Sequence, residues 1–152
     1  MYFKLETIHT QDPQAFTLDN WKAFASISES GHDGMLMGIL RSAFVKVGDW
    51  HDVSLLEQTL RLTVEDYDGK GVTLYRTPDT VISVKDGNGN ALPYTRNGRK
   101  VEVHASGTVV IEYSTRAMCG EADDMRTKAF RYALAVYDGE DSTVLNNILM
   151  ER

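Results

Sequence analysis

Residues 33–50 read DGMLMGILRSAFVKVGDW, and they have the clearest pattern in the chain. Its apolar side chains recur at helical spacing, at Leu36, Ile39, Leu40, Ala43, Phe44 and Val47. Residues spaced i, i+3, i+4 and i+7 share one face of an α-helix, so the stretch predicts an amphipathic helix from Asp33 to Trp50. An apolar helix face is buried in a stable fold, and the rest of the chain must therefore supply its partner.

The length and composition are those of a globular chain. It has 152 residues, 42% of them apolar and 25% charged, which suits one core and predicts a single domain over residues 1–152. No apolar run is long enough to cross a membrane, and the start, MYFKLETIHTQD, lacks the pattern of a signal peptide. We therefore expect synthesis in the cytoplasm and no membrane partner. The single Cys119 excludes an intramolecular disulfide framework.

The net charge of −6 is unevenly distributed. Residues 1–52 carry 4 basic and 7 acidic side chains, residues 53–117 carry 8 of each, and residues 118–152 carry 4 and 7. A protein that grips duplex DNA needs clustered Lys and Arg to neutralise phosphates. The charge pattern therefore indicates a protein that does not grip DNA.

The segments before the central helix are shorter. Residues 1–16 contain the turn-forming pair Asp12-Pro13, and we interpret them as an extended arm or short strand. A short helix is predicted from Thr17, a suitable N-cap, to Ile27. The glycine-containing stretch of residues 28–34 is predicted to be a loop.

A change of period after Trp50 predicts a β section over residues 54–115. Leu60, Leu62 and Val64 alternate with polar residues, as in a half-buried strand. Asp68-Gly69 predicts a hairpin turn from which residues 72–75 return. Further short strands are expected at residues 80–86, 91–95, 100–104 and 108–113, separated by turns rich in Gly and Asn. These strands predict an antiparallel meander.

Helical spacing returns near the C-terminus. It predicts a helix from Ala122 to Tyr137, ended by Gly139 and followed by a terminal segment, residues 139–152. Asp141 or Ser142 can cap a last short helix, whose apolar residues are Val144, Leu145, Ile148 and Leu149. Because this helix is too short to be stable alone, we expect it to fold back or to dock on a partner. The predicted fold class is therefore α+β, in which the N-terminal helices and the C-terminal helix form a small bundle with an inserted antiparallel β-meander.

Motifs for metal or nucleotide chemistry are incomplete in this sequence. Asp86, Asn88 and Asn90 match the first ligands of an EF-hand loop, but Ala91 and Asn97 stand where glycine and glutamate are needed, so a hairpin turn is the better interpretation. Dinucleotide and phosphate-loop glycine patterns are missing from their required contexts.

The histidines and the cysteine are also poor candidates for chemistry. His32 and His51 lie at opposite ends of the central helix, about 28 Å apart at 1.5 Å per residue, so they cannot share a metal. His9 and His104 have no ligand at metal spacing, and Cys119 has no signature of a nucleophile. Trp21 and Trp50 are expected in the core or against a neighbour. We therefore predict no catalytic residue, no metal and no cofactor, and a protein that is not an enzyme.

The order of elements resembles that of the head-tail connector, or adaptor, proteins of tailed bacteriophages. The resemblance rests on the first helix, the acidic turn and the long helix from Asp33 to Trp50, followed by TLRLTVEDYDG at residues 59–69 and TPDTVISVKD at residues 77–86. GTVVIEY at residues 107–113 and the helix after an acidic stretch, residues 121–137, complete it. It covers residues 17–138. The chain departs from the family in STRAMCG, residues 114–120, where a linker with proline and glycine is common, and in its long N-terminal arm.

The resemblance implies a structural virion protein made in the bacterial host cytoplasm. It implies a homo-oligomeric ring, commonly of twelve subunits, beneath the portal protein in the viral neck. The terminal segment, with Val144, Leu145, Ile148 and Leu149, is then expected to dock on the portal, and the opposite face to meet a stopper or tail protein. The genome is expected to pass through a central DNA channel without sequence-specific binding, since acidic helices repel phosphates.

Other functions remain open at the level of sequence. A tail-completion protein one layer below the adaptor has the same expected features. A β module that binds carbohydrate or peptide is the first unrelated alternative, because Asn- and Tyr-bearing turns can stack on and hydrogen-bond to sugars. A small enzyme that uses Asp66, Asp68 or Glu112 as acid and base is the second.

Overall fold

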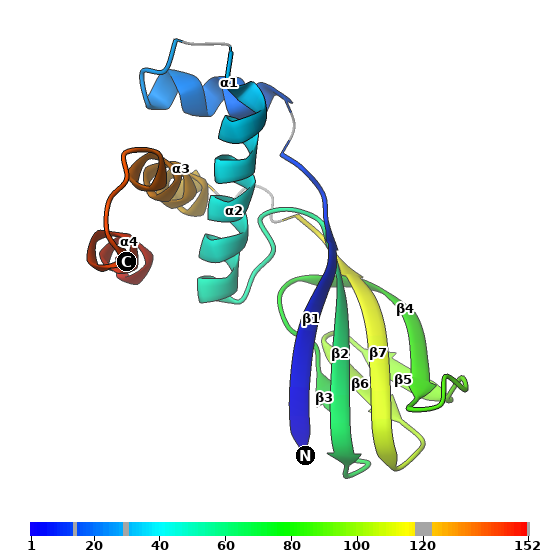
Figure 1. The fold of residues 1–152 in the computed structure, drawn as a ribbon. Coiled ribbons are helices and arrows are strands. Elements are labelled where there is room, and N and C mark those ends of the chain that lie inside the picture. The colour runs from blue at the N-terminus through cyan, green and yellow to red at the C-terminus, as the bar shows by residue number, and fades with distance from the viewer. Residues whose placement is uncertain (14, 29–30, 118–122, 152) are drawn as a thin grey trace. The chain divides into compact units, whose positions relative to one another are not determined.

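The computed structural model describes residues 1–13, 15–28, 31–117 and 123–151 (Figure 1). The chain divides into two compact units. The β unit consists of Met1–Thr10 and Glu57–Ala117, and the helical unit consists of Gln11–Leu56 and Met118–Arg152. The predicted α+β class with antiparallel sheets is confirmed.

The β unit contains two antiparallel sheets. The larger sheet has the strand order β1-β2-β7-β4, and its strands are β1 (Tyr2–Thr10), β2 (Gln58–Tyr67), β7 (Gly107–Thr115) and β4 (Pro78–Asp86). The smaller sheet has the order β3-β6-β5, with β3 (Val72–Thr73), β6 (Lys100–Val103) and β5 (Tyr94–Asn97). In Figure 1 the smaller sheet lies behind the larger one.

The alternation predicted for β2 places one side of the larger sheet in a core. Leu60, Leu62 and Val64 are fully buried and face the smaller sheet's Val101 and its neighbours. On the other side of the sheet β2 carries polar side chains, and there the guanidinium of Arg61 donates to the carboxylate of Glu112 on β7 at 3.0 Å. The sheet therefore has a core side and an outer side.

The strands pair in a different order from that of a meander. The turn at Asp68-Gly69 is present, but the expected return of residues 72–75 onto residues 58–67 is wrong, because β3 pairs with β6 in the smaller sheet. The hydroxyl of the buried Tyr67 bonds to the backbone just before β3 and at the end of β6, since it accepts the backbone N–H of Gly71 at 3.0 Å and that of Val103 at 3.1 Å. Gly71 has a φ of 107°, which favours glycine there.

The N-terminal arm is a full strand of the larger sheet. β1 covers nine residues and pairs with β2 from Tyr2, opposite Glu65, to Thr10, opposite Gln58. The β unit therefore includes the first ten residues of the chain, and its second part, Glu57–Ala117, begins three residues later and ends two residues later than the predicted section of residues 54–115. Thr10 is buried, and its hydroxyl accepts the side-chain amide of Gln58 at 3.3 Å.

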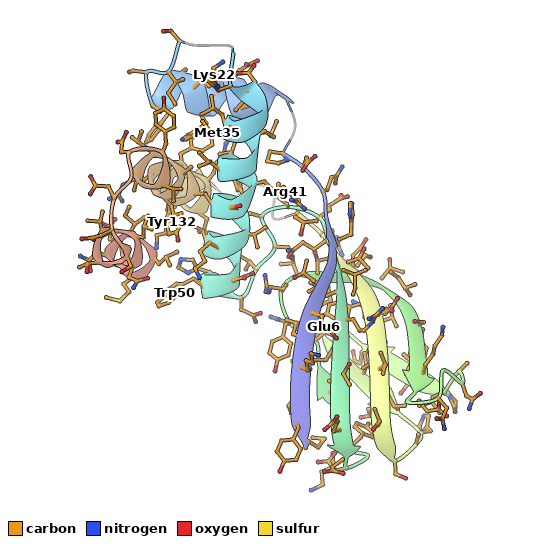
Figure 2. All side chains as sticks on the ribbon, viewed as in Figure 1. Glu6, Lys22, Met35, Arg41, Trp50 and Tyr132 are labelled. Atoms are coloured by element: carbon orange, nitrogen blue, oxygen red, sulfur yellow. The ribbon has the colours of Figure 1, made fainter. Side chains whose placement is uncertain are left out.

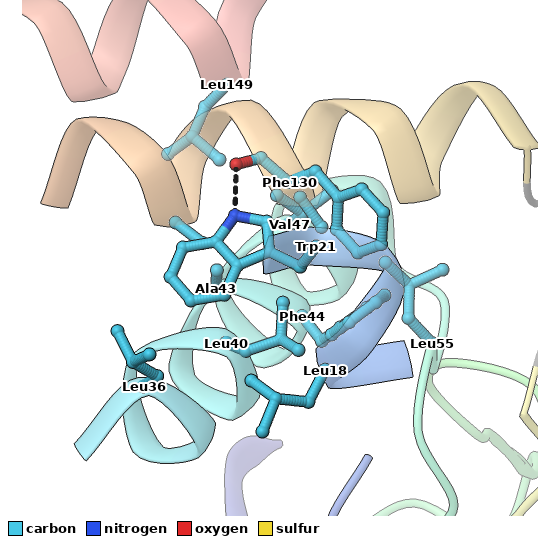
Figure 3. Packing of buried hydrophobic residues seen from close by; sticks show 12 residues of the cluster. Leu18, Trp21, Leu36, Leu40, Ala43, Phe44, Val47, Leu55, Phe130 and Leu149 are labelled. Carbon is cyan, nitrogen blue, oxygen red and sulfur yellow. Dashed lines mark hydrogen bonds between the residues drawn. The ribbon is translucent and has the colours of Figure 1, made fainter. Parts of the chain in front are cut away.

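The helical unit is organised around α2 (Asp33–His51), which matches the helix predicted from Asp33 to Trp50. The other helices are α1 (Ala15–Phe24), α3 (Asp123–Tyr137) and α4 (Ser142–Met150). The predicted face of α2 is buried together with side chains of the other three helices (Figure 3). Close to its end, Gly48 packs so tightly that an added Cβ would lie 2.6 Å from the carbonyl oxygen of Val53.

The two tryptophans have different environments. Trp21 on α1 is fully buried, and its indole N–H donates to the backbone carbonyl of Phe130 on α3 at 3.1 Å (Figure 3). Trp50 near the end of α2 is 53% exposed (Figure 2). Trp21 is therefore the core residue that was predicted, whereas Trp50 is available to a neighbour. Among the described residues, no helix has the length and apolar character needed to span a bilayer.

Candidate docking segment

The predicted terminal helix is present as α4. Asp141 caps it, as one of the two predicted caps, and its carboxylate accepts the backbone N–H of Val144 at 3.1 Å. Before the cap, Gly139 has a φ of 75°, and the N–H of Glu140 donates to the carbonyl of Ala135 at 2.9 Å. This geometry is a Schellman motif, which ends α3 at the predicted glycine and reverses the chain into α4.

The four residues predicted to dock on a partner have different exposures. Ile148 and Leu149 are buried, and Leu149, only 1% exposed, belongs to the core of the helical unit (Figure 3). Leu145 is half-buried and Val144 is 36% exposed. Of the two predicted arrangements, the folded-back one is therefore observed in this structure. Docking on a partner stays a prediction, and with α4 in this position Val144 is the most accessible of the four.

The chain after α4 is held by Lys128 and Arg131 of α3, which we call the C-terminal clamp. The guanidinium of Arg131 makes two contacts with the carboxylate of Glu151, Nη2 to Oε1 at 3.0 Å and Nη1 to Oε2. The ammonium of Lys128 donates to the carbonyl of Leu149 at 3.3 Å and to that of Glu151. Paired charge-assisted hydrogen bonds fix direction as well as distance. The clamp therefore anchors the end of α4 from outside the core.

His51, at the end of α2, completes this arrangement. Its Nε2 lies 3.1 Å from the ammonium of Lys128. Burial and, second, the charge of Lys128 lower the pKa of His51 from its ordinary 6.5. The neutral ring can accept a hydrogen bond from Lys128, so the geometry and the direction of the pKa shift agree.

The pKa of Glu151 is lowered from its ordinary 4.5, first by its hydrogen bonds to Arg131. The same hydrogen bonds raise the pKa of Arg131. Both groups therefore stay charged near neutral pH, and the contact between them weakens only in acid.

A groove of about 420 Å³ lies beside the clamp. Its lining residues are His51, Asp124, Met125, Thr127, Lys128, Arg131 and Glu151. Because the two clamp residues already bind the chain end, the groove belongs to the anchoring of α4. One feature of the sequence indicates the clamp, namely the i, i+3 spacing that puts Lys128 and Arg131 on one face of α3. Their partner is not indicated by any local pattern, because Glu151 lies 20 residues after Arg131.

The carboxylates considered for catalysis are engaged separately. Glu112 pairs with Arg61 on the outer side of the larger sheet, with Oε1 2.9 Å from Nη2. Asp68 accepts the backbone N–H of Lys70 at 2.8 Å and so closes a turn. Asp66 lies near the end of β2, where the register with β7 shifts, and has a φ of 54°. The structure therefore does not bring these three carboxylates into one described site.

The calcium-like loop is a hairpin turn, as predicted. The carboxylate of Asp86 accepts the backbone N–H groups of Asn88 and Asn90, both at 2.9 Å. These bonds, that of Asn90 first, lower the pKa of Asp86. Over the residues that the structure describes, no group of three or more His, Cys, Asp or Glu is placed to hold a metal ion. Cys119 and Glu121 lie outside the described residues.

Comparison with known proteins gives structural matches alone. No family model matches the chain, and no curated protein matches it at a significant level. A chain in a structure of the neck of an empty gene transfer agent (GTA) particle, computed with C6 symmetry, matches with a TM-score of 0.68 at 17% identity, over 89% of this chain and 84% of that one.

Two further structures match over similar lengths. A chain in the virion of a native GTA particle matches with a TM-score of 0.65 at 17% identity, over 88% of this chain and 84% of that one. A chain in the neck of a native GTA particle, computed with C12 symmetry, matches with a TM-score of 0.55 at 15% identity, over 93% of both chains. The chain therefore has the fold of chains found in structures of gene transfer agent necks and virions.

Proposed function

We propose that this chain is a structural protein of a viral neck, a head-tail connector (adaptor) subunit that joins capsid to tail. The observation that carries the proposal is the fold match to a chain in a GTA neck, with a TM-score of 0.68 over 89% of this chain. The resemblance in element order to phage adaptors supports it independently of the coordinates. The protein is then part of the virion and not an enzyme.

The subunits form a ring in this proposal. The matched necks were computed with C6 and C12 symmetry, which makes a ring of twelve adaptors, stacked on rings of related symmetry, the expected assembly. The net charge of −6 lies entirely in the helical unit, which carries 7 basic and 13 acidic side chains, while the β unit carries 9 of each. Helical units that line a DNA channel would repel phosphates and leave the genome free to move.

The C-terminal segment, residues 139–152, contacts the portal protein in this proposal, and another surface meets a stopper or tail protein. The exposed side of α4 carries Val144 and Met150, which is 60% exposed. Ile148 and Leu149 are in the core, so they hold α4 in place while Val144 and Met150 meet the portal.

Light scattering on the full chain, alone and mixed with a purified portal ring, tests the proposal. The expected result is a complex whose added mass corresponds to twelve subunits. Val144→Asp and Met150→Asp should each weaken the complex at least tenfold, because a charge is then placed in an apolar contact. Asn146→Asp is the matched control, since it adds the same charge at an exposed polar position of α4. A chain that never binds the portal ring contradicts the adaptor role.

A tail-completion protein one layer below the adaptor is the second candidate, favoured by the match to a neck computed with C6 symmetry. A complex that forms with a stopper or tail ring and not with the portal, with six subunits, would identify this layer. The carbohydrate- or peptide-binding alternative predicts a monomer that ignores both rings and binds a glycan or peptide through the β unit.

A further inference from the structure

β1 forms an open edge of the larger sheet. Within the described residues its only strand neighbour is β2. The opposite edge, β4, begins at Pro78 and contains two register shifts, which are features that protect an edge from pairing with another strand. β1 has no proline and runs in regular register from Tyr2 to Thr7, with a single shift at its end. It is therefore the edge that is suited to pair with a further strand.

Apolar side chains are exposed along this edge. Tyr2 is 70% exposed, Phe3 48% and Ile8 46%. Phe3 is paired with the buried Val64 and lies on the core side of the sheet. The smaller sheet has strands of only two to four residues and does not cover Phe3. β1 therefore combines a free backbone edge with uncovered apolar area.

The sequence of β1 is complementary to itself about Leu5. In an antiparallel pair of two β1 strands with a two-fold axis at Leu5, Lys4 of each copy stands opposite Glu6 of the other. Both side chains lie on the outer side of the sheet, because Lys4 pairs with Thr63 and Glu6 with Arg61 on β2. Within one chain the Nζ of Lys4 lies 3.9 Å from Oε1 of Glu6, and the two side chains are 72% and 38% exposed, so both are within reach of a second copy.

The apolar residues obey the same symmetry. Tyr2 stands opposite Ile8 of the other copy, at each end of the charged pairs, and Leu5 meets Leu5 at the centre on the core side. Phe3 stands opposite Thr7. The regular run from Tyr2 to Thr7 includes the five central positions of this register, and only the outermost pairs, between Tyr2 and Ile8, lie at the register shift of β1. In an antiparallel pair of two β1 strands, no other register places Lys4 of each copy opposite Glu6 of the other.

We propose that two copies of the free chain pair through β1 in this register and join their four-stranded sheets into one continuous antiparallel sheet. The contact is a single strand pair, smaller than a standard interface, so the dimer forms reversibly at high concentration. This dimer goes beyond the proposed function, because it is not the contact between neighbours in a ring. The two chains of a two-fold dimer use the same surface, whereas neighbours in a larger cyclic ring contact each other through two different surfaces. The dimer is a state of chains outside the ring, in which the open edge is protected from unspecific pairing.

Charge reversal gives a direct test. The mass of the wild-type chain, measured by light scattering from about 1 to about 500 µM, should rise from the 17.0 kDa of a monomer towards twice that value. Lys4→Glu places Glu opposite Glu, and Glu6→Lys places Lys opposite Lys, so each variant alone should stay monomeric over at least a tenfold higher concentration range. An equimolar mixture of the two variants should dimerise, because every facing pair is then of opposite charge.

Lys100 and Glu102 of β6 supply a matched control. They form a pair with the same spacing at 3.4 Å, and each side chain is 52% exposed. Lys100→Glu and Glu102→Lys, alone or mixed, should dimerise like the wild type. Circular dichroism verifies that each variant is folded, which matters for Glu6→Lys because the new lysine stands opposite Arg61.

A measurement without any variant covers the case in which a substitution disturbs β1. Amide hydrogen exchange of residues 2–8 in the wild type should slow as the concentration rises, while that of β4 stays constant. A wild type that remains monomeric to about 500 µM, or a mixture that remains monomeric, overturns the proposal. Neither result involves the portal ring, so a failure here is distinct from a failure of the adaptor assignment.

Discussion

Leu149→Ala tests whether α4 belongs to the core of the helical unit or only lies against it. Leu149 is 1% exposed and packs in the same cluster as Trp21 and Phe130. Leu→Ala in a core costs about 2–5 kcal/mol, the larger values where the surroundings cannot relax. α4 is a short helix that can move towards the cavity, so we expect a loss of about 2–3 kcal/mol in the free energy of unfolding.

Val144→Ala is the matched control, because it truncates an apolar side chain of the same helix that is 36% exposed. It should change the free energy of unfolding by about 0.5 kcal/mol or less. Both substitutions introduce alanine, the best helix former, so helix propensity cannot explain a loss in either variant.

Urea denaturation followed by tryptophan fluorescence measures both variants. Trp21 reports on the core, and Trp50, which is 53% exposed, is replaced by Phe in every variant so that one reporter remains. If Leu149→Ala and Val144→Ala had equal free energies of unfolding, α4 would contribute nothing to the core, and the docking segment would be free to leave it.

Two glycines of α2 should respond in opposite directions to alanine. Gly48→Ala brings a Cβ to 2.6 Å from the carbonyl oxygen of Val53 and should lower the free energy of unfolding by about 1–3 kcal/mol. The Cβ of Gly38→Ala meets open space, so this substitution should raise the free energy of unfolding by up to about 1 kcal/mol. Thermal melts measure both variants, and equal effects would contradict the observed packing. A pH titration of stability tests His51, whose lowered pKa means that its contribution is complete above pH 6.5 and is lost as the pH falls through the lower folded value. His51→Gln keeps an acceptor for Lys128 and should reduce the loss of stability between about pH 7 and about pH 5. If the variant lost as much stability as the wild type over this range, the loss would come from other titrating groups.

Local signals in the sequence were sufficient for α2, α3 and α4, whereas α1 begins at Ala15 and ends at Phe24 instead of running from the predicted cap Thr17 to Ile27. The apolar spacing of residues 33–50 and the capping residues Gly139 and Asp141 act within a few residues, and the structure has each of them where predicted. The pairing of strands is not local. The turn after β2 was visible, but β3 pairs with the distant β6, where the backbone N–H of Val103 also donates to the hydroxyl of Tyr67.

For the candidate docking segment, too, the sequence pattern predicted the helix but not the residues that it contacts. The amphipathic pattern of α4 correctly indicated a helix with one apolar side, but an apolar side fits the chain's own core and a foreign surface equally well. The contacts of Leu149 with the core and of Glu151 with Arg131 join segments that are far apart in the sequence. Only the three-dimensional structure distinguishes the residues that hold α4 from those that remain exposed.

The interleaving of the two units has a consequence for how the chain folds during synthesis. The larger sheet needs β1, from the first ten residues, and β7, which ends at Thr115, so the ribosome must produce all of the intervening chain before the sheet is complete. The core of the helical unit likewise waits for α3 and α4 at the far end. Contacts between such distant segments slow folding, because long loops must close before any pairing is gained. Neither unit can emerge from the ribosome as a finished domain, and α1 and α2 must therefore remain only partly buried until almost the whole chain has been made.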